Sequence, residues 1–326
     1  MKDALDTALL NDFQRDFPLC TRPFEAMAES LGVPETVVLA RFQALCAQGK
    51  VSRIGPVFSP RRVGASTLVA MAVPQDALNT VAAQVNLFPG VNHNYEREHR
   101  FNLWFVLTAP DEAMLQDELG EIRRVTGFDV LPLPMLEAFH IDLGFCLQGK
   151  PAGQRVAAHS TLPPLGQTDE LNAEARALVA ALQGGIPLIS QPYAAIADQI
   201  GQTESRVRVR IEQWIAAGII KRFGVVVRHH ELGFSANAML VHNIPDARVS
   251  EIGERLAGEP AVTLCYRRPR RLPEWPHNLF CMIHGRERAT VLAAITRLRA
   301  EHGLDAYDHE ILFSKTRFKQ VGARYA

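Results

Sequence analysis

The stretch FPLCTRPFEAMAESLG, residues 17–32, decides the fold because it recurs as IPLISQPYAAIADQIG at residues 186–201. Pro18, Pro23 and Gly32 each meet the same residue type 169 positions later. Further along, Val91 and Tyr95 match the same residue types at an offset of 171, and the Asn-Leu pair at 102–103 recurs at 278–279. Self-similarity at a fixed period indicates homologous units in one chain. The sequence therefore predicts two similar halves.

The composition limits the class of protein. A chain of 326 residues is long enough for about two domains on the usual length prior. Its 35 basic and 35 acidic residues give a net charge of zero, so no global field attracts nucleic acid or an anionic membrane. The N-terminal MKDALDTALLNDFQRDF lacks the apolar core of a signal peptide, and we expect a cytoplasmic protein without a membrane span. The five cysteines are scattered without CxxC spacing, and we expect no metal site.

Both halves open with three segments of helical apolar spacing and a Gly-containing turn before the third, which is typical of a helix-turn-helix. Strand-like and helical runs then alternate in the order βαββαβ, the pattern of a ferredoxin-like module. The expected fold class is α+β, two repeats of a winged helix-turn-helix followed by such a module. The predicted helices are 5–17, 23–31 and 34–48, then 169–183, 193–200 and 203–217; the predicted module elements of the first half are 67–73, 76–87, 91–99, 102–108, 111–126 and 129–142, with the same order from 236 to 319.

These patterns also set the expected boundaries. The run QGKPAGQRVAAHSTLPPLGQT, residues 148–168, has the Pro, Gly and small polar residues of an extended linker. The predicted units are a winged helix-turn-helix at 1–64, a βαββαβ module at 65–147, the linker at 148–168, a second winged helix-turn-helix at 169–233 and a second module at 234–326.

This order of units is similar to that of the Lrp/AsnC family of transcription regulators, so DNA binding must be weighed. A recognition helix presents polar and basic side chains to the bases and phosphates. The third helix, PETVVLARFQALCAQG, offers Arg41 and otherwise mainly apolar or acidic groups. Its counterpart TESRVRVRIEQWIAAG places Arg206 and Arg210 one turn apart, a pattern that also suits a solvated face. The helices alone do not decide the question.

The candidate chemistry lies in the second strand pair of each half. In VNHNYEREHRFNLWFVL, residues 91–107, alternation along a strand puts His93, Tyr95, Arg97 and His99 on one face. In VTLCYRRPRRLPEWPHNLFCMIHG, residues 262–285, Tyr266, Arg268 and Arg270 share a face in the same register. Guanidinium groups hold carboxylates through a planar fork. Such rows suit a ligand that carries several carboxylates.

These strands also carry a more specific resemblance. NYEREHRFNLWFVL, residues 94–107, resembles the signature of the first-half subunit type of siroheme decarboxylases, and YRRPRRLPEWPHNLFCMIHGRER, residues 266–288, resembles that of the second-half type. Their order in one chain is similar to the fused, NirDL-like form. The resemblance implies a carboxy-lyase that removes two acetate carboxyl groups of siroheme as carbon dioxide, giving 12,18-didecarboxysiroheme in heme d1 biosynthesis. It implies no cofactor, since the iron enters with the substrate.

Within this hypothesis each candidate residue has a role. We expect Arg97, Arg100, Arg267, Arg268, Arg270 and Arg271 to anchor the substrate carboxylates, with Trp275 beside Pro276 in an ordered lid over a flat ligand. A proton donor is needed, and His93, His99 or His277 can supply it because the ordinary pKa of histidine lies near cellular pH. Tyr95 and Tyr266 would orient the substrate.

Simpler interpretations stay open for these residues. The two tyrosines can serve strand packing alone, the RRPRR run can be a solvated loop, and His93 or His99 can be an iron ligand instead of an acid. The second half also has a five-residue expansion in its arginine loop, so one half can be mainly structural.

The expected partners follow from the same argument. They are siroheme and other tetrapyrroles, without a membrane and without DNA as the principal ligand. The two halves are expected to pair as an intramolecular pseudo-heterodimer, and a further homodimer is left open. The rival functions are an Lrp/AsnC-like regulator that senses a tetrapyrrole and a heme-binding carrier without catalysis.

Overall fold

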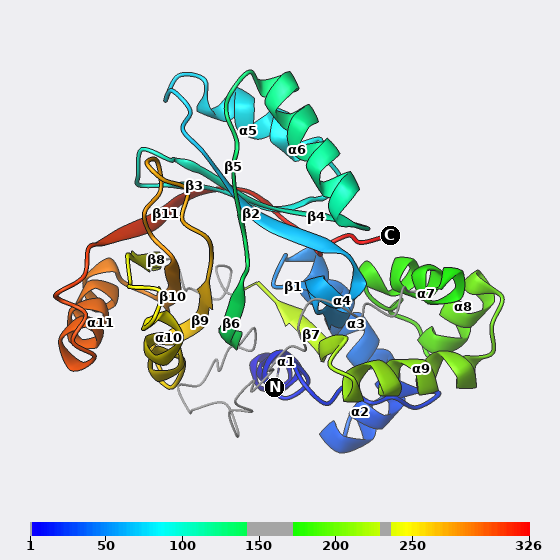
Figure 1. Cartoon of the computed structure of the whole chain (residues 1–326). Helices are drawn as coiled ribbons and strands as arrows, with labels where there is room; N and C mark the ends of the chain where they lie inside the picture. The colour runs from blue at the N-terminus through cyan, green and yellow to red at the C-terminus, as the bar shows by residue number, and fades with distance from the viewer. Residues whose placement is uncertain (1, 142–171, 229–235) are drawn as a thin grey trace.

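The computed structural model of the chain describes residues 2–141, 172–228 and 236–326, so the predicted linker 148–168 lies outside the described residues (Figure 1). The described residues form two helix-turn-helix units and two α/β modules. The two units lie together on one side of the molecule, and the modules build a large sheet beside them.

Each helix-turn-helix unit has three helices close to the predicted ranges. Pro23 and Pro192 open the second helices, where a missing N–H costs nothing, and Gly32 and Gly201 end them with φ of 65° and 66°, a region that favours glycine. The first helix is shorter than the predicted 5–17 because the backbone leaves helical geometry and reaches a φ of 53° at Asp16. The helices are α1 (Lys2–Asn11), α2 (Pro23–Leu31), α3 (Glu35–Ala47), α7 (Ala173–Gln183), α8 (Pro192–Ile200) and α9 (Glu204–Ala216).

The two helix-turn-helix units are joined to each other. The strand after each unit, β1 (Val51–Phe58) or β7 (Ile220–Val227), pairs antiparallel with the other, with Gly55 opposite Gly224. Phe17 packs on Phe223 at 6.1 Å between ring centroids, and the Tyr193 hydroxyl donates to the Pro18 carbonyl at 3.0 Å. One hydrophobic core therefore serves both units, and a short helix α4 (Pro60–Val63) leads from the first unit into its module.

The two α/β modules follow the predicted βαββαβ order. Helices cover one face of each sheet and leave the opposite face for the partner module. The elements of the first module are β2 (Ala65–Met71), α5 (Leu78–Asn86), β3 (Val91–Arg97), β4 (Leu103–Ala109), α6 (Glu112–Thr126), β5 (Leu131–Pro134) and β6 (Glu137–Ile141). Those of the second module are β8 (Ala236–His242), α10 (Val249–Ala257), β9 (Val262–Arg267), β10 (Leu279–Gly285), α11 (Arg288–Glu301) and β11 (His309–Gln320).

An exchange of strands fuses the modules into one nine-stranded sheet of order β5-β2-β4-β3-β11-β8-β10-β9-β6. The sequence predicts a single strand over 129–142, but the chain forms β5 on its own module and then β6 against β9 of the other. Pro132 and Pro134 cannot donate backbone hydrogen bonds, which explains a break there. In return, the first part of β11 pairs with β8 and its second part with β3.

The exchanged strands bury side chains in the foreign half. Phe139 of β6 packs in the core of the second module against Gly253, where a Cβ would meet its ring at 2.3 Å. Phe318 of β11 packs against the core of the first module. A third core lies on the sheet faces opposite the helices and takes residues from both halves, including Trp104 and Phe280. Pairing of the two halves within one chain is therefore confirmed.

Candidate functional site

The two hairpins predicted to carry the chemistry meet where the halves join. The loop between β3 and β4, residues 98–102, lies against the longer loop between β9 and β10, residues 268–278. Arg100 Nη1 lies 3.2 Å from Glu274 Oε2, and the rings of His99 and Trp275 meet edge-on with centroids 5.6 Å apart. Candidate residues from the two halves thus gather at one junction.

Arg97 is buried at this junction. The residue ends β3 and is 9% exposed. Its Nη1 donates to the Leu312 carbonyl of β11 at 3.1 Å, and Nη2 lies 3.9 Å from Met282 Sδ of β10. Burial lowers the pKa of the Arg97 guanidinium, an effect that the nearby Tyr266 and Tyr95 oppose. A side chain of the first half therefore extends into the interior of the second.

Arg268, the repeat counterpart of Arg97, is also buried, with 8% of the residue exposed. Its guanidinium lies over the Tyr266 ring at 4.5 Å from the centroid and 5.8 Å from that of Phe280. Its Nη1 donates to the Leu133 carbonyl of β5, in the first half. Burial lowers the pKa of Arg268 as well. The two arginines occupy matched positions, and each contacts the other half.

Neither of these guanidiniums is neutralised by an acid of the described residues. Within the described ranges, no carboxylate pairs with Arg97 or Arg268, and the Nε of each has no hydrogen-bond partner. A buried charge without a partner costs several kcal/mol, and aromatic rings offset only part of that cost. Two such cations occupy matched positions of the two halves.

His93 and Tyr95 precede Arg97 on β3, on the strand face that the sequence predicts. The rings of His93 and Tyr95 stack with centroids 6.4 Å apart and 20° between their planes, so these side chains share a face. Tyr95 pairs across the ladder with Arg317 of β11. Burial raises the pKa of the Tyr95 hydroxyl, and the charges of Arg97, Arg317 and Arg228 lower it. The hydroxyl is therefore a neutral donor surrounded by cations.

His99 and His277 share one carboxylate. His99 Nε2 contacts Glu310 Oε2 of β11, and His277 Nε2 lies 3.7 Å from Glu310 Oε1. Burial lowers the pKa of both imidazoles, and the Glu310 charge acts in the opposite direction. His277 is almost fully buried, whereas the side chain of Glu310 is 42% exposed. The cluster joins a buried imidazole to the protein surface.

The remaining predicted anchors lie away from the buried pair. Arg267 Nη2 and Arg270 Nη1 both bind Asp246 Oδ1, at 3.0 and 2.8 Å. Arg270 also binds Asn243 and the Ile244 carbonyl. The strand alternation predicts that Arg270 shares a face with Arg268. This prediction is wrong, because β9 ends at Arg267 and both arginines lie in the loop after it. In the structure Arg267 and Arg270 secure the loop.

The other two predicted anchors are exposed on the same loops. Arg271 Nε donates to the Pro132 carbonyl at 2.9 Å, and Arg100 pairs with Glu274 while covering the Phe101 ring. Neither is buried, so a bound ligand would have to compete with water for them.

Trp275 is part of the core and does not lie over an open site as the predicted lid would require. It is 1% exposed and packs on Trp104 at 5.2 Å and on His277 at 5.0 Å between centroids. An isolated backbone bridge between Arg271 and Trp275 turns the loop back so that the indole enters the interior. Its burial fixes the position of His277.

Sequence reasoning missed Glu310 and Arg317, which lie beside candidate residues of the first half. Both belong to β11, which the pattern assigns to the second module alone. Only the strand exchange brings Glu310 to His99 and Arg317 to Tyr95. Among the residues that the structure describes, no group of three or more His, Cys, Asp or Glu is placed to hold a metal ion, and no helix is long and apolar enough to cross a bilayer.

Comparisons with known proteins agree with this architecture. The model of the AsnC-like ligand binding domain matches residues 62–140 and 231–319, and that of the siroheme decarboxylase NirDL-like HTH domain matches 6–51 and 175–221. The siroheme decarboxylase NirDL subunit of Paracoccus denitrificans (strain Pd 1222) is 44% identical over 99% of this chain and 98% of its own length. The siroheme decarboxylase NirD subunit of Stutzerimonas stutzeri is 57% identical over 44% of this chain and 95% of its own length.

A solved structure extends the similarity to three dimensions. The crystal structure of the siroheme decarboxylase NirDL in co-complex with an iron-uroporphyrin III analogue superposes with a TM-score of 0.70 and 26% identity, covering all of this chain and 95% of that one. Two helix-turn-helix units and two AsnC-like ligand-binding modules in one chain define a fused, Lrp/AsnC-like protein. More particularly, the chain belongs to the siroheme decarboxylase family and is a carboxy-lyase.

Proposed function

We propose that this chain removes two acetate carboxyl groups of siroheme as carbon dioxide and so forms 12,18-didecarboxysiroheme, a step towards heme d1. The observation that carries the proposal is the matched pair Arg97 and Arg268, two buried guanidiniums without an acidic partner among the described residues. The NirDL structure with an iron-uroporphyrin III analogue supports a carboxylate-bearing macrocycle as the ligand.

The residues provide what the reaction needs from the protein. In each decarboxylation the bond between the methylene carbon and the carboxylate breaks, carbon dioxide leaves, and the carbon takes up one proton to become a methyl group. The electron pair left behind is delocalised into the macrocycle, so the protein need not supply an electron sink. Arg97 and Arg268 would hold ring carboxylates in a desolvated site and keep them ionised. Anchoring of this kind positions the reacting acetate.

The proton donor is the cluster of His99, His277 and Glu310. Burial lowers the pKa of both imidazoles, so a protonated imidazole here is a stronger acid than an exposed one. The neighbouring Glu310 stabilises that protonated form and reaches solvent, from which the proton can be replaced. No separate cofactor enters this scheme, because the iron belongs to the substrate.

Mass analysis of siroheme after anaerobic incubation with the purified full chain tests the proposal. We expect the loss of the mass of two carbon dioxide molecules with the wild type. Arg97→Met keeps an unbranched side chain and removes the charge, and we expect it to lose fewer than two carbon dioxide molecules from siroheme while the variant still folds. Arg124→Met, on the exposed surface of α6, removes a guanidinium paired with Glu121 and should behave as the wild type.

Unchanged siroheme in every sample would contradict the proposal. If unchanged siroheme stayed bound to the protein, the result would favour the carrier. If the tetrapyrrole altered binding of a DNA duplex, it would favour the regulator.

The recognition helices give the regulator little support, because their basic side chains other than Arg210 are paired within the protein. Arg41, the basic residue of α3, is engaged by Asp6 of α1, with Nε to Oδ1 at 2.8 Å and a second bond through Nη2. On α9, Arg208 pairs with Glu204 and Arg206 with Glu174. Side chains held in this way are poorly placed for base contacts. The shared core of the two units instead supports a scaffolding role.

A further inference from the structure

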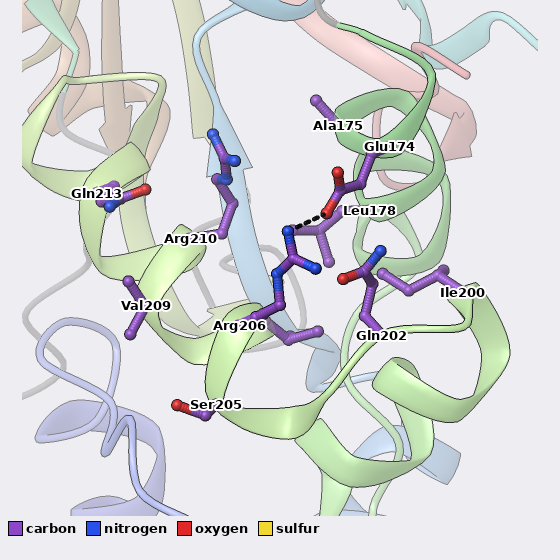
Figure 2. A pocket seen from close by; sticks show the side chains of 11 residues that line it. Glu174, Ala175, Leu178, Ile200, Gln202, Ser205, Arg206, Val209, Arg210 and Gln213 are labelled. Atoms are coloured by element: carbon purple, nitrogen blue, oxygen red, sulfur yellow. Dashed lines mark ion pairs between the residues drawn. The ribbon is translucent and has the colours of Figure 1, made fainter.

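The second helix-turn-helix unit contains a cavity between α7 and α9 that is half open to solvent and that the proposed decarboxylation does not use. Its volume is about 230 Å³. Apolar side chains of Leu178, Ile200 and Val207 line it on one side, and Arg206, Arg210 and Gln202 supply polar groups. Figure 2 shows Arg206 and Arg210 extending from α9 to the same side, with Glu174 of α7 beside Arg206. None of these residues belongs to the candidate site described above.

The first half shows what occupies the equivalent position there. Arg41 of α3 corresponds to Arg210 of α9, and Asp6 of α1 corresponds to Ala175 of α7, since each pair is 169 positions apart. In the first half the Asp6 carboxylate binds both Nε and Nη2 of Arg41. In the second half that carboxylate is replaced by a methyl group. The cavity thus lies where the first half holds a carboxylate of its own.

Two polar groups of the cavity, the solvent-exposed Arg210 and the buried Gln202 Oε1, have no protein partner among the described residues. Within residues 2–141, 172–228 and 236–326, Arg210 forms no hydrogen bond or ion pair, whereas Arg206 has Glu174 at 3.6 Å. Gln202 Oε1 is buried and accepts no hydrogen bond from those residues. With two guanidiniums and one carboxylate, the lining has an excess of one positive charge. A neutral apolar ligand would offer no group to pair with that positive charge.

We propose that this cavity binds a small aliphatic carboxylate, whose carboxyl group takes the place of the missing Asp6 carboxylate on Arg210. The planar guanidinium offers the same fork that Arg41 offers to Asp6. The aliphatic part of the ligand lies against Leu178, Ile200 and Val207. The site is a second ligand-binding site, on the helix-turn-helix unit and independent of the tetrapyrrole site.

Calorimetric titration of the full chain with 4-methylpentanoate tests the inference, and the isosteric neutral 4-methylpentanamide is the control ligand. We expect the amide to bind at least about tenfold more weakly, because a charge-assisted hydrogen bond is replaced by a neutral one. Equal affinity for acid and amide would overturn the proposal, since the guanidinium would then contribute nothing to binding.

Two variants locate the binding. Arg210→Gln removes the cation, and Ala175→Asp restores the residue of the first half and fills the site with an internal carboxylate. Both should abolish acid binding while thermal unfolding shows an intact fold, and Ala175→Asp should be at least as stable as the wild type. Arg124→Gln on α6 should bind as the wild type does. Binding that survives Arg210→Gln or Ala175→Asp would place the acid elsewhere and overturn the proposal.

The reciprocal change strengthens the test. Asp6→Ala empties the matching position beside Arg41, and we expect it to raise the number of bound 4-methylpentanoate molecules by one per chain. An unchanged number would contradict the correspondence between Asp6 and an external carboxylate. A DNA duplex bound through Arg210, in preference to the acid and with strong dependence on salt, would identify the ligand as phosphate and overturn the proposal as well.

Discussion

The hairpin of the first half, residues 91–102, and that of the second half, residues 262–278, share a tyrosine and an arginine two positions apart but differ around them. In the first half the row continues to His93, and in the second half Leu264 stands at that position. The first loop is tight. The second hairpin has a five-residue insertion, and its loop directs Trp275 and His277 into the interior.

The difference indicates a division of tasks. The first half contributes a strand face of His93, Tyr95 and Arg97, and Arg317 of the exchanged strand lies opposite Tyr95. The second half contributes His277 and, through β11, Glu310. Neither half alone contains both the cationic row and the complete acid cluster. The proposed decarboxylations can therefore use one composite site, built from residues of both halves, or two separate sites.

The prediction with the largest expected effect distinguishes one composite site from two separate sites. Arg97→Met and Arg268→Met should each lower turnover by up to about a hundredfold, since a desolvated charged anchor is worth up to about 3 kcal/mol. If one composite site performs both steps, each variant should lose both. If the halves act separately, each variant should stop at a product that has lost one carbon dioxide. Mass analysis of the products distinguishes the two results.

The stability of these variants provides the control. Methionine fills a volume close to that of arginine without a buried charge, so the free energy of unfolding should be unchanged or higher. A large loss of stability in Arg97→Met or Arg268→Met would show that the guanidinium serves the fold, and the loss of turnover could not then be assigned to substrate binding.

A second prediction concerns Glu310, which connects His99 and His277. Its charge raises the pKa of both imidazoles against the effect of burial, so Glu310→Gln should lower both pKa values further. The protonated donor would then exist only at lower pH. We expect turnover at neutral pH to fall about tenfold, with the midpoint of the pH profile shifted to lower pH. A profile that keeps its midpoint would exclude the cluster as the acid.

Much of this comparison could be predicted from the sequence because it depends on local spacing. The repeat, the helix-turn-helix units and the matched arginines follow from residue periodicity, and Arg97 and Arg268 are buried at equivalent positions. Alternation along β3 also predicted correctly that His93 and Tyr95 share a face. Such features involve neighbours within one element, where the pleat or the helical turn fixes the geometry.

The parts that could not be predicted depend on contacts between halves. Nothing in residues 129–142 signals that β6 leaves its module, and nothing in residues 309–320 signals that β11 pairs with β3. Glu310 and Arg317 therefore could not be assigned to the site. The roles of Arg267 and Arg270 depend on Asp246, a surface residue in a different loop. Pairings of this kind are tertiary, and a single sequence does not show them.

A third prediction tests whether Arg267 and Arg270 secure the loop or anchor the ligand. Asp246→Asn removes the charge that holds both guanidiniums and leaves the size of the side chain unchanged. If they secure the loop, its loosening should raise KM about threefold and leave kcat unaffected, a modest change because the ion pairs are exposed. A decrease in KM would instead show that the released arginines bind substrate carboxylates. Steady-state kinetics on siroheme measures both constants.

The smallest effect on turnover is expected at His242, a core position at which the two halves differ. His242 is fully buried at the position that Met71 occupies in the first half, and its ring stacks on His309 at 5.7 Å between centroids. Burial, together with the charges of His309, Arg299 and His277, lowers the pKa of His242 to about 3. Its unfolded value is about 6.5. Between these values the unfolded chain binds a proton that the folded chain does not.

Folding stability should therefore fall as the pH falls below about 6.5, by up to about 1.4 kcal/mol per pH unit for this one group. At pH 7 the imidazole is neutral in both states, and the penalty is absent. His242→Met gives the second half the residue of the first and removes the titrating group. Denaturant unfolding at pH 7 and pH 5 should show a smaller loss of stability for the variant than for the wild type. Equal losses would mean that His242 takes up its proton in the folded state, which its burial without a hydrogen-bond partner among the described residues argues against.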